Sequence, residues 1–217
     1  MNWKRWRAVP WIDTRSRFVS LVPPNGSLLD LGSSDGSTLR HFAELRPDIS
    51  LAAADISGSP DSYPAGTEFH RANFESDVLP WSTSKFDAIT CMHVVEHLSS
   101  ARHLLLESAR LLKPGGRLYI ETPHPKTEAM ATVTGEAAGC VTMNFYDDPT
   151  HIRPVPVDDL AVLAEQCGLK PMDRGTSRNW IFTAAYPVFR ALRMNTRKRY
   201  VAQQHWTGWS AFLIAVR

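Results

Sequence analysis

The stretch "SLLDLGSSDGSTLRHFAEL", residues 27–45, combines a short apolar run, a turn rich in glycine and serine, and apolar residues at helical spacing. This pattern predicts a strand, a tight turn and a helix that begins near Ser37. Such a turn lets backbone N–H groups face a ligand at the helix N-terminus, and we expect Gly32 and Gly36 to form it. The pattern also allows a turn without a ligand.

Further strand-length and helix-length segments follow in alternation. Apolar, strand-like segments occupy residues 50–57, 67–74, 85–92, 117–123 and 208–217, and helical spacing occupies 99–116 and 156–169. Strands that alternate with helices predict an α/β fold with a largely parallel sheet. Ligands of such sheets bind at the carboxyl ends of the strands, which places the site before any motif is considered.

Composition is that of an ordinary globular domain. The chain has 217 residues, 43% of them hydrophobic and 21% charged, with a net charge of +2. This charge is too small to indicate a nucleic-acid partner, and three widely spaced cysteines form neither a disulfide framework nor a metal knuckle. The N-terminal sequence lacks the apolar stretch of a secretory signal, and no run is long enough to span a membrane. We expect a cytoplasmic protein.

Four motifs occur in the order "LLDLGSSDGSTL", "AAADIS", "FDAITCMHVVEHL" and "ARLLKPGGRLYIETP". Together they resemble the class I S-adenosylmethionine-dependent methyltransferases over about residues 26–123. The resemblance implies a Rossmann-like, mostly parallel seven-stranded sheet with helices on both faces and a C-terminal antiparallel strand, all in one domain, 1–217. A dinucleotide dehydrogenase would instead carry G-x-G-x-x-G. The chain departs from the family at Ser34, where a glycine is usual.

The resemblance also implies S-adenosylmethionine as the cofactor and a set of residues that bind it. We expect Gly32 and its neighbours to face the methionine part, and Asp55 to bind the ribose. Ile56 would pack on the adenine, while Asn73 and Phe74 stand where the family often has an acid that contacts the adenine amino group. The expected cofactor site comprises Asp30, Gly32, Ser34, Gly36, Asp55, Ile56, Asn73, Phe74 and His93.

His93, Glu96 and His97 also fit the H-x-x-E-H spacing of a family of zinc peptidases. That chemistry requires both histidines on one helical face. In the methyltransferase family the segment "FDAITCMH" is the fourth strand, so the two histidines would not share a face, and we expect no metal. His93 would line the cofactor pocket or be a packed polar residue, while Glu96 and His97 would brace the turn.

The segment "NFYDDPTHIRPV", residues 144–155, resembles a "DPTH-x-RP" element found near the substrate pocket of some bacterial methyltransferases. An oxygen or nitrogen nucleophile that carries a proton benefits from a base. His151 is the first candidate, followed by Tyr146 and His124. Asn144, Tyr146 and Arg153 are expected to bind the substrate. Alternatively, His151 only locks the loop.

Three outer segments are expected around this core: an N-terminal helical lid at 1–25 and substrate-side insertions at 124–156 and 178–209. The last insertion mixes aromatic and basic residues. It could cover the substrate site, dock a carrier or a lipid, form a dimer contact, or simply pack on the sheet as amphipathic helices.

The predicted function is methylation of an oxygen or nitrogen atom of a small molecule or biosynthetic intermediate. We expect a small-molecule substrate and no nucleic acid, and a homodimer is left open. One alternative is an enzyme that transfers or cyclises the aminocarboxypropyl portion of the cofactor and releases methylthioadenosine. Another is a non-catalytic cofactor-binding partner protein.

Overall fold

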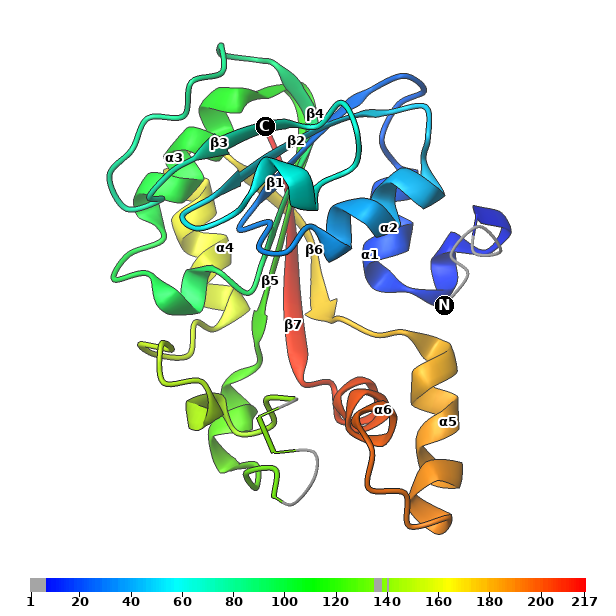
Figure 1. Cartoon of the computed structure of the whole chain (residues 1–217). Coiled ribbons are helices and arrows are strands. Elements are labelled where there is room, and N and C mark those ends of the chain that lie inside the picture. Colours follow the sequence, from blue (N-terminus) through cyan, green and yellow to red (C-terminus); the bar gives the residue numbers. More distant parts are fainter. Residues whose placement is uncertain (1–6, 135–137, 140) are drawn as a thin grey trace.

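A seven-stranded sheet forms the centre of the structure, a computed structural model that describes residues 7–134, 138, 139 and 141–217 (Figure 1). The strand order is β3-β2-β1-β4-β5-β7-β6. The strands are β1 Ser27–Leu31, β2 Ser50–Asp55, β3 Glu68–Arg71, β4 Phe86–Met92, β5 Leu112–Pro123, β6 Lys170–Thr176 and β7 Ser210–Val216. β1 to β5 pair in parallel, and β7 is antiparallel to both of its neighbours. The predicted fold class is confirmed.

Helices cover both faces of this sheet (Figure 1). The α-helices of the described residues are α1 Thr14–Ser20, α2 Ser37–Leu45, α3 Arg102–Leu111, α4 Val157–Gln166, α5 Trp180–Ala191 and α6 Arg197–Thr207. One apolar cluster joins the sheet to α1 and α2, and a second joins the opposite face to α3 and α4. No helix in the described part of the chain is long and apolar enough to cross a bilayer.

Strand β1 shows why the opening stretch predicts this arrangement. Leu29 and Leu31 belong to the cluster on the α3 and α4 side, whereas Leu28 belongs to the cluster on the α1 and α2 side. A strand that is buried on both faces is apolar at nearly every position. Residues 28–31 fit this rule, with Asp30 as the one polar residue. The centre of the sheet is therefore the part that sequence identifies most directly.

The edges of the sheet differ from the expectation. β6 was not located in the sequence, because none of its residues is buried and it contains Pro171 and Gly175. β3 is shorter than the expected 67–74, and only a 3₁₀ turn, Pro60–Ser62, lies between β2 and β3. Edge strands have few buried residues, so they carry a weak hydrophobic pattern. The first six residues of the expected lid at 1–25 lie outside the described residues.

The turn between β1 and α2 has the backbone of a tight, left-handed loop. Gly32, Ser34 and Gly36 have φ angles of 79°, 45° and 74°. A Cβ atom on Gly32 would lie 2.1 Å from Cγ2 of Val94, so this position requires glycine for space as well as for conformation. The Gly32 N–H donates to the carbonyl oxygen of Ala54 at 2.8 Å, which ties the turn to the end of β2.

Gly32→Ala should destabilise the protein by about 3 kcal/mol, because left-handed strain of about 1 kcal/mol adds to a clash with Val94. Gly66→Ala is the matched control, since Gly66 has a φ of 81° and no atom lies within 4 Å of the position that the added methyl group would occupy. This control should lose only about 1 kcal/mol. Urea unfolding of both variants measures the difference, and equal losses would show that Val94 imposes no constraint.

Candidate functional site

A cavity of about 500 Å³ lies at the carboxyl ends of the central strands. Its wall includes Gly32 and Ser34 from the turn after β1, His93 just after β4, and Glu121 from β5. The segments that follow in the chain close it from the other side with His151 and with residues of α6 and the start of β7. This is the edge of a parallel sheet at which ligands bind, and the volume is that of a small-molecule site.

Asp55 joins the glycine turn to the end of β2. Its carboxylate accepts hydrogen bonds from the backbone N–H groups of Ser34 and Ser57, each at 2.8 Å. The next residue, Ile56, is 63% exposed and presents an apolar surface beside this carboxylate. Tyr63 secures the other side of the turn, since its hydroxyl donates to the Ser34 carbonyl at 3.2 Å.

Asp30 lies beneath the turn rather than in the cavity wall. It is 1% exposed, and the Thr90 hydroxyl donates to its carboxylate at 2.6 Å. Burial raises the pKa of Asp30 to about 7, although the bond from Thr90 lowers the pKa. The side chain supports the strand end from below, and its predicted contact with a cofactor stays a prediction.

A buried carboxylate, Glu121, organises the charged part of the cavity. Arg15 from α1 donates to both of its oxygens, at 2.6 and 2.9 Å, and the Tyr119 hydroxyl donates at 2.6 Å. Burial opposes the charge, but the attraction and the hydrogen bonds of Arg15 hold the pKa of Glu121 well below its usual range. The ion pair therefore connects α1 to β5.

His93 lies between two carboxylates. Its ring nitrogens are 3.2 Å from Glu96 and 3.4 Å from Glu121. Burial disfavours the imidazolium, but hydrogen bonds to Glu121 and Glu96 outweigh it and raise the pKa of His93 to about 9. At neutral pH His93 is thus a cation, and together with Arg15 it balances the two buried carboxylates.

His151 is held in the cavity wall by a hydrogen bond to the backbone. Its Nδ1 is 2.6 Å from the Phe145 carbonyl oxygen, and a carbonyl only accepts, so the proton lies on Nδ1. Nε2 lies 3.9 Å from an oxygen of Asp148. The His151 ring packs against Phe145 and His97 in the wall of the cavity, where the side chain is 5% exposed.

Three potential ligand atoms, from Glu96, His97 and His151, lie within 4.8 Å of one another. The Glu96 carboxylate already contacts the His93 ring and accepts from the Thr122 hydroxyl at 3.2 Å. His93 has a φ of 55° and precedes a 3₁₀ turn, Val95–His97, so the five residues of the H-x-x-E-H pattern do not form an α-helix. The zinc peptidase arrangement is absent from this segment, which the structure describes in full, and Glu96 braces the turn as expected.

The other residues expected to act on substrate lie outside the cavity wall. The Asn144 amide donates to two backbone carbonyls, and Tyr146, 57% exposed, donates its hydroxyl to Glu128 at 2.7 Å. This bond raises the pKa of Tyr146. The His124 ring accepts a backbone N–H at the start of a 3₁₀ turn, and Arg153 is exposed. Their predicted roles remain predictions, but the structure does not bring them together with His151.

The residues expected near the adenine lie at the end of β3. The Asn73 side chain is exposed, and its oxygen accepts the backbone N–H of Glu75 at 3.0 Å. Phe74 is 9% exposed and belongs to the apolar core. Asn73 is therefore accessible to a ligand, whereas Phe74 mainly fixes the position of the segment.

Several wall residues were not identified from the sequence. Arg15, Glu121, Gln204, His205 and Trp209 all line the cavity. Arg15 and Glu121 are 106 residues apart, so no local pattern connects them. Glu121 did leave a signal, namely a carboxylate at the end of the apolar run "LYIETP", where burial requires a cationic partner.

Comparison with known proteins places the chain among methyltransferases. A family model described as "Methyltransferase domain" matches residues 3–173. The ubiquinone biosynthesis O-methyltransferase of Ruegeria pomeroyi is 30% identical over 155 residues, which cover 68% of this chain and 61% of that protein. The corresponding protein of Xanthomonas axonopodis pv. citri is 29% identical over 173 residues, with coverage of 73% and 70%. The chain thus spans about three fifths of the length of the Ruegeria relative.

Solved structures agree on the fold. An S-adenosylmethionine-dependent methyltransferase from Mesorhizobium loti superimposes with a TM-score of 0.65 and 16% identity, over 94% of this chain and 97% of that one. A putative methyltransferase from Haloferax volcanii, solved in complex with an activator, also gives 0.65, with 17% identity and coverage of 99% and 96%. At these identities the likeness shows the fold alone.

The stability of the protein should fall by about 2 kcal/mol between pH 6.5 and pH 9. The His93 proton is held in the folded state up to about pH 9 but is lost from the unfolded chain near pH 6.5. The stabilisation that the protonated His93 provides is complete below pH 6.5 and disappears as pH rises through 9. The expected loss of about 2 kcal/mol is reduced to allow for partial exposure of the His93 ring.

Urea unfolding across this range measures the effect. His93→Gln should remove most of the dependence, while His103→Gln, at a half-buried histidine of α3, should leave it in place. A wild-type stability that stays flat between pH 6.5 and pH 9 would contradict a cationic His93.

Proposed function

The chain belongs to the methyltransferase-domain family of class I S-adenosylmethionine-dependent methyltransferases, and on that basis we propose that it methylates a hydroxyl oxygen of a small biosynthetic intermediate. The observation that carries this proposal is the shared cavity, in which the glycine turn after β1 faces the same space as His151. Both relatives named above are O-methyltransferases of ubiquinone biosynthesis, which supports an oxygen acceptor.

The residues around the turn fit S-adenosylmethionine. Gly32 lines the cavity, and without a side chain its backbone can approach a ligand closely. Asp55 ends β2 with a carboxylate that is 7% exposed and holds the Ser34 and Ser57 N–H groups, and Ile56 follows it with an exposed apolar side chain. In our proposal Gly32 and Ser34 hold the methionine part, Asp55 the ribose and Ile56 the adenine.

In methyl transfer the cofactor supplies the reactive methyl group, and the protein positions the acceptor. S-adenosylmethionine supplies a methyl group that its sulfonium already activates, so the protein chiefly needs to align the acceptor oxygen with that carbon. His151 is the proposed base, because its ring lines the cavity with Nδ1 held by a carbonyl, and in the neutral ring Nε2 can accept the hydroxyl proton of the acceptor. The Phe145 carbonyl accepts from Nδ1 and would stabilise the imidazolium that results.

His93 is unsuited to this role, since it is already protonated at neutral pH. Together with Arg15 it neutralises Glu96 and Glu121, so the buried wall of the cavity carries little net charge. We assign His93, Arg15 and Glu121 to positioning: they hold α1 and the end of β4 against β5.

Mass spectrometry of every adenosine product tests the activity. The purified protein is incubated with S-adenosylmethionine, with and without a panel of hydroxylated and amino metabolites. Formation of S-adenosylhomocysteine that depends on a hydroxylated acceptor supports the proposal. Methylthioadenosine above the blank without an acceptor would instead show transfer or cyclisation of the aminocarboxypropyl group, and tight cofactor binding without any product would indicate a non-catalytic partner protein.

His151→Gln should lower kcat by about 10² to 10⁴ while leaving the Kd for S-adenosylmethionine within about twofold, because the ring is proposed to act on the acceptor. Tyr146→Phe is the control, since the Tyr146 hydroxyl bonds to Glu128 away from the cavity, and kcat should change by less than about threefold. Steady-state kinetics and calorimetric titration measure the two quantities. A large effect of Tyr146→Phe with a small effect of His151→Gln would reverse the assignment.

Asp55→Asn should weaken S-adenosylmethionine binding by roughly 10- to 100-fold, since it replaces a charged acceptor that also orients the Ser34 N–H. Asp61→Asn, at an exposed acid in the 3₁₀ turn nearby, should change the Kd by less than about twofold. Isothermal titration gives both constants, and urea unfolding checks that each variant is folded. Unchanged binding in folded Asp55→Asn would refute the ribose assignment.

A further inference from the structure

The outward side of α5 is apolar along its whole length. Exposed residues recur at one-face helical spacing and comprise Trp180, Ile181, Ala184, Val188, Ala191 and the capping residue Leu192. Their large members are far from buried: Trp180 and Val188 are 56% exposed and Leu192 is 68% exposed. We call these six residues the α5 apolar face. A polar side chain would be expected at such positions of a helix that faces only water.

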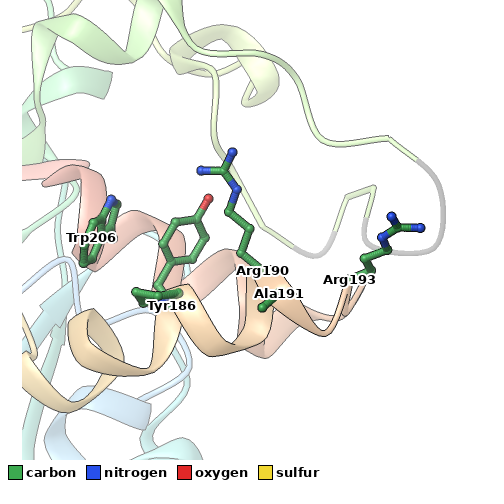
Figure 2. Close-up of a pocket in the computed structure, with 6 residues that line it drawn as sticks. Tyr186, Arg190, Ala191, Arg193 and Trp206 are labelled. Carbon is green, nitrogen blue, oxygen red and sulfur yellow. The ribbon is translucent and has the colours of Figure 1, made fainter.

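Arginines lie beside a shallow pocket that Ala191 of the α5 apolar face also lines. Figure 2 shows Arg190 and Arg193 extending from α5 on the same side as the Tyr186 ring, with Trp206 of α6 beyond it. The pocket has a volume of about 460 Å³, and Trp206 is 49% exposed. Long arginine side chains at the margin of an apolar surface can reach anionic groups while their stems cover apolar contacts.

Charge is distributed very unevenly along the chain. Residues 174–217 contain eight Lys and Arg and no Asp or Glu, whereas residues 1–173 hold the other 16 Lys and Arg with all 22 Asp and Glu. Three of the cations, Arg197, Lys198 and Arg199, open α6 directly after the turn that follows α5. The hairpin of α5 and α6 is thus a positive end on a chain whose remainder has a net charge of −6.

We propose that the α5 apolar face lies in the interface of an anionic lipid bilayer and attaches the protein to it peripherally. A helix that joins an apolar face to flanking cations inserts its apolar side among acyl chains and places the cations at the lipid phosphates. Both requirements are met here within residues 180–199. The charge complementarity identifies the partner as an anionic surface.

A second copy of the chain fits this surface less well. Packing two α5 apolar faces together would bring two segments that lack any acid next to each other, so Arg190 and Arg193 of each copy would find no opposite charge on the facing hairpin. An anionic bilayer instead covers the apolar residues and pairs the cations at the same time.

Attachment through α5 would also place the cavity close to the bilayer. Val201, Gln204 and His205 of α6 line the cavity, and α5 packs against α6 at the same end of the molecule (Figure 1). If the proposed methylation holds, the acceptor would be an amphipathic molecule that enters from the bilayer. Attachment itself does not rest on the proposed activity.

Co-sedimentation with vesicles tests the attachment on the full chain. Vesicles of phosphatidylcholine with about one third phosphatidylglycerol are compared with pure phosphatidylcholine, at low salt and at about 0.5 M salt, where charges are screened. Val188→Asp puts a charge on the α5 apolar face. Val162→Asp is its match, because Val162 is 57% exposed on α4, on another part of the surface.

The wild-type protein should bind the anionic vesicles at least tenfold more tightly than the neutral ones, with weaker binding at high salt. Val188→Asp should bind at least tenfold more weakly and Val162→Asp as the wild type does. Absence of vesicle binding at low salt, or equal losses in both variants, would overturn the proposal. So would a dimer in vesicle-free solution that Val188→Asp dissociates, which would make the face a contact between copies.

Calorimetric titration with S-adenosylmethionine separates this proposal from the methyltransferase assignment. Val188→Asp should bind the cofactor as the wild type does. Cofactor binding without vesicle binding would remove the bilayer proposal alone, whereas vesicle binding without cofactor binding would remove the proposed activity alone.

Discussion

The buried carboxylate of Glu121 is the group around which the site is arranged. It is 1% exposed within the sheet, where an unpaired charge would cost several kcal/mol. Arg15 supplies the opposite charge from α1, and the Tyr119 hydroxyl and the His93 ring complete its contacts. The N-terminal helix and the carboxyl ends of β4 and β5 are therefore held in one position by a single charge.

This charge also distinguishes the two histidines in the cavity wall. His93 faces Glu96 and Glu121 and is cationic, so it has no lone pair to accept a proton. His151 instead faces a backbone carbonyl with Nδ1, and its Nε2 lies 3.9 Å from an oxygen of Asp148. The two histidines in the wall of the same cavity thus have different neighbours: His93 lies between two carboxylates, whereas Nδ1 of His151 meets a neutral carbonyl.

The two ends of the molecule contrast in their surface chemistry. The sheet and its four covering helices bury their apolar residues in two clusters, one on each face. The hairpin of α5 and α6 instead leaves a row of apolar residues in contact with water and carries five cations and no acid. Exposure of this kind costs free energy unless something covers it, which is the physical basis for assigning the hairpin to a bilayer surface.

The centre of the fold and the location of the glycine turn after β1 could be predicted from the amino-acid sequence alone. Both depend on local requirements: a strand buried on two faces must be apolar at residues 28–31 apart from a partnered acid, and a left-handed turn requires glycine at positions 32 and 36. The edge strand β6 escaped detection because an edge imposes no burial pattern on its residues.

The charged wall of the cavity and the orientation of the loop at 144–155 follow from tertiary contacts and could not be predicted. Arg15 meets Glu121 across 106 residues, and no local pattern encodes a contact of that range. Tyr146 and His151 share one motif, yet Tyr146 turns to Glu128 while His151 turns into the cavity. Neighbours in sequence face opposite sides of a loop when different partners satisfy their hydrogen bonds, and those partners become known only once the chain is folded.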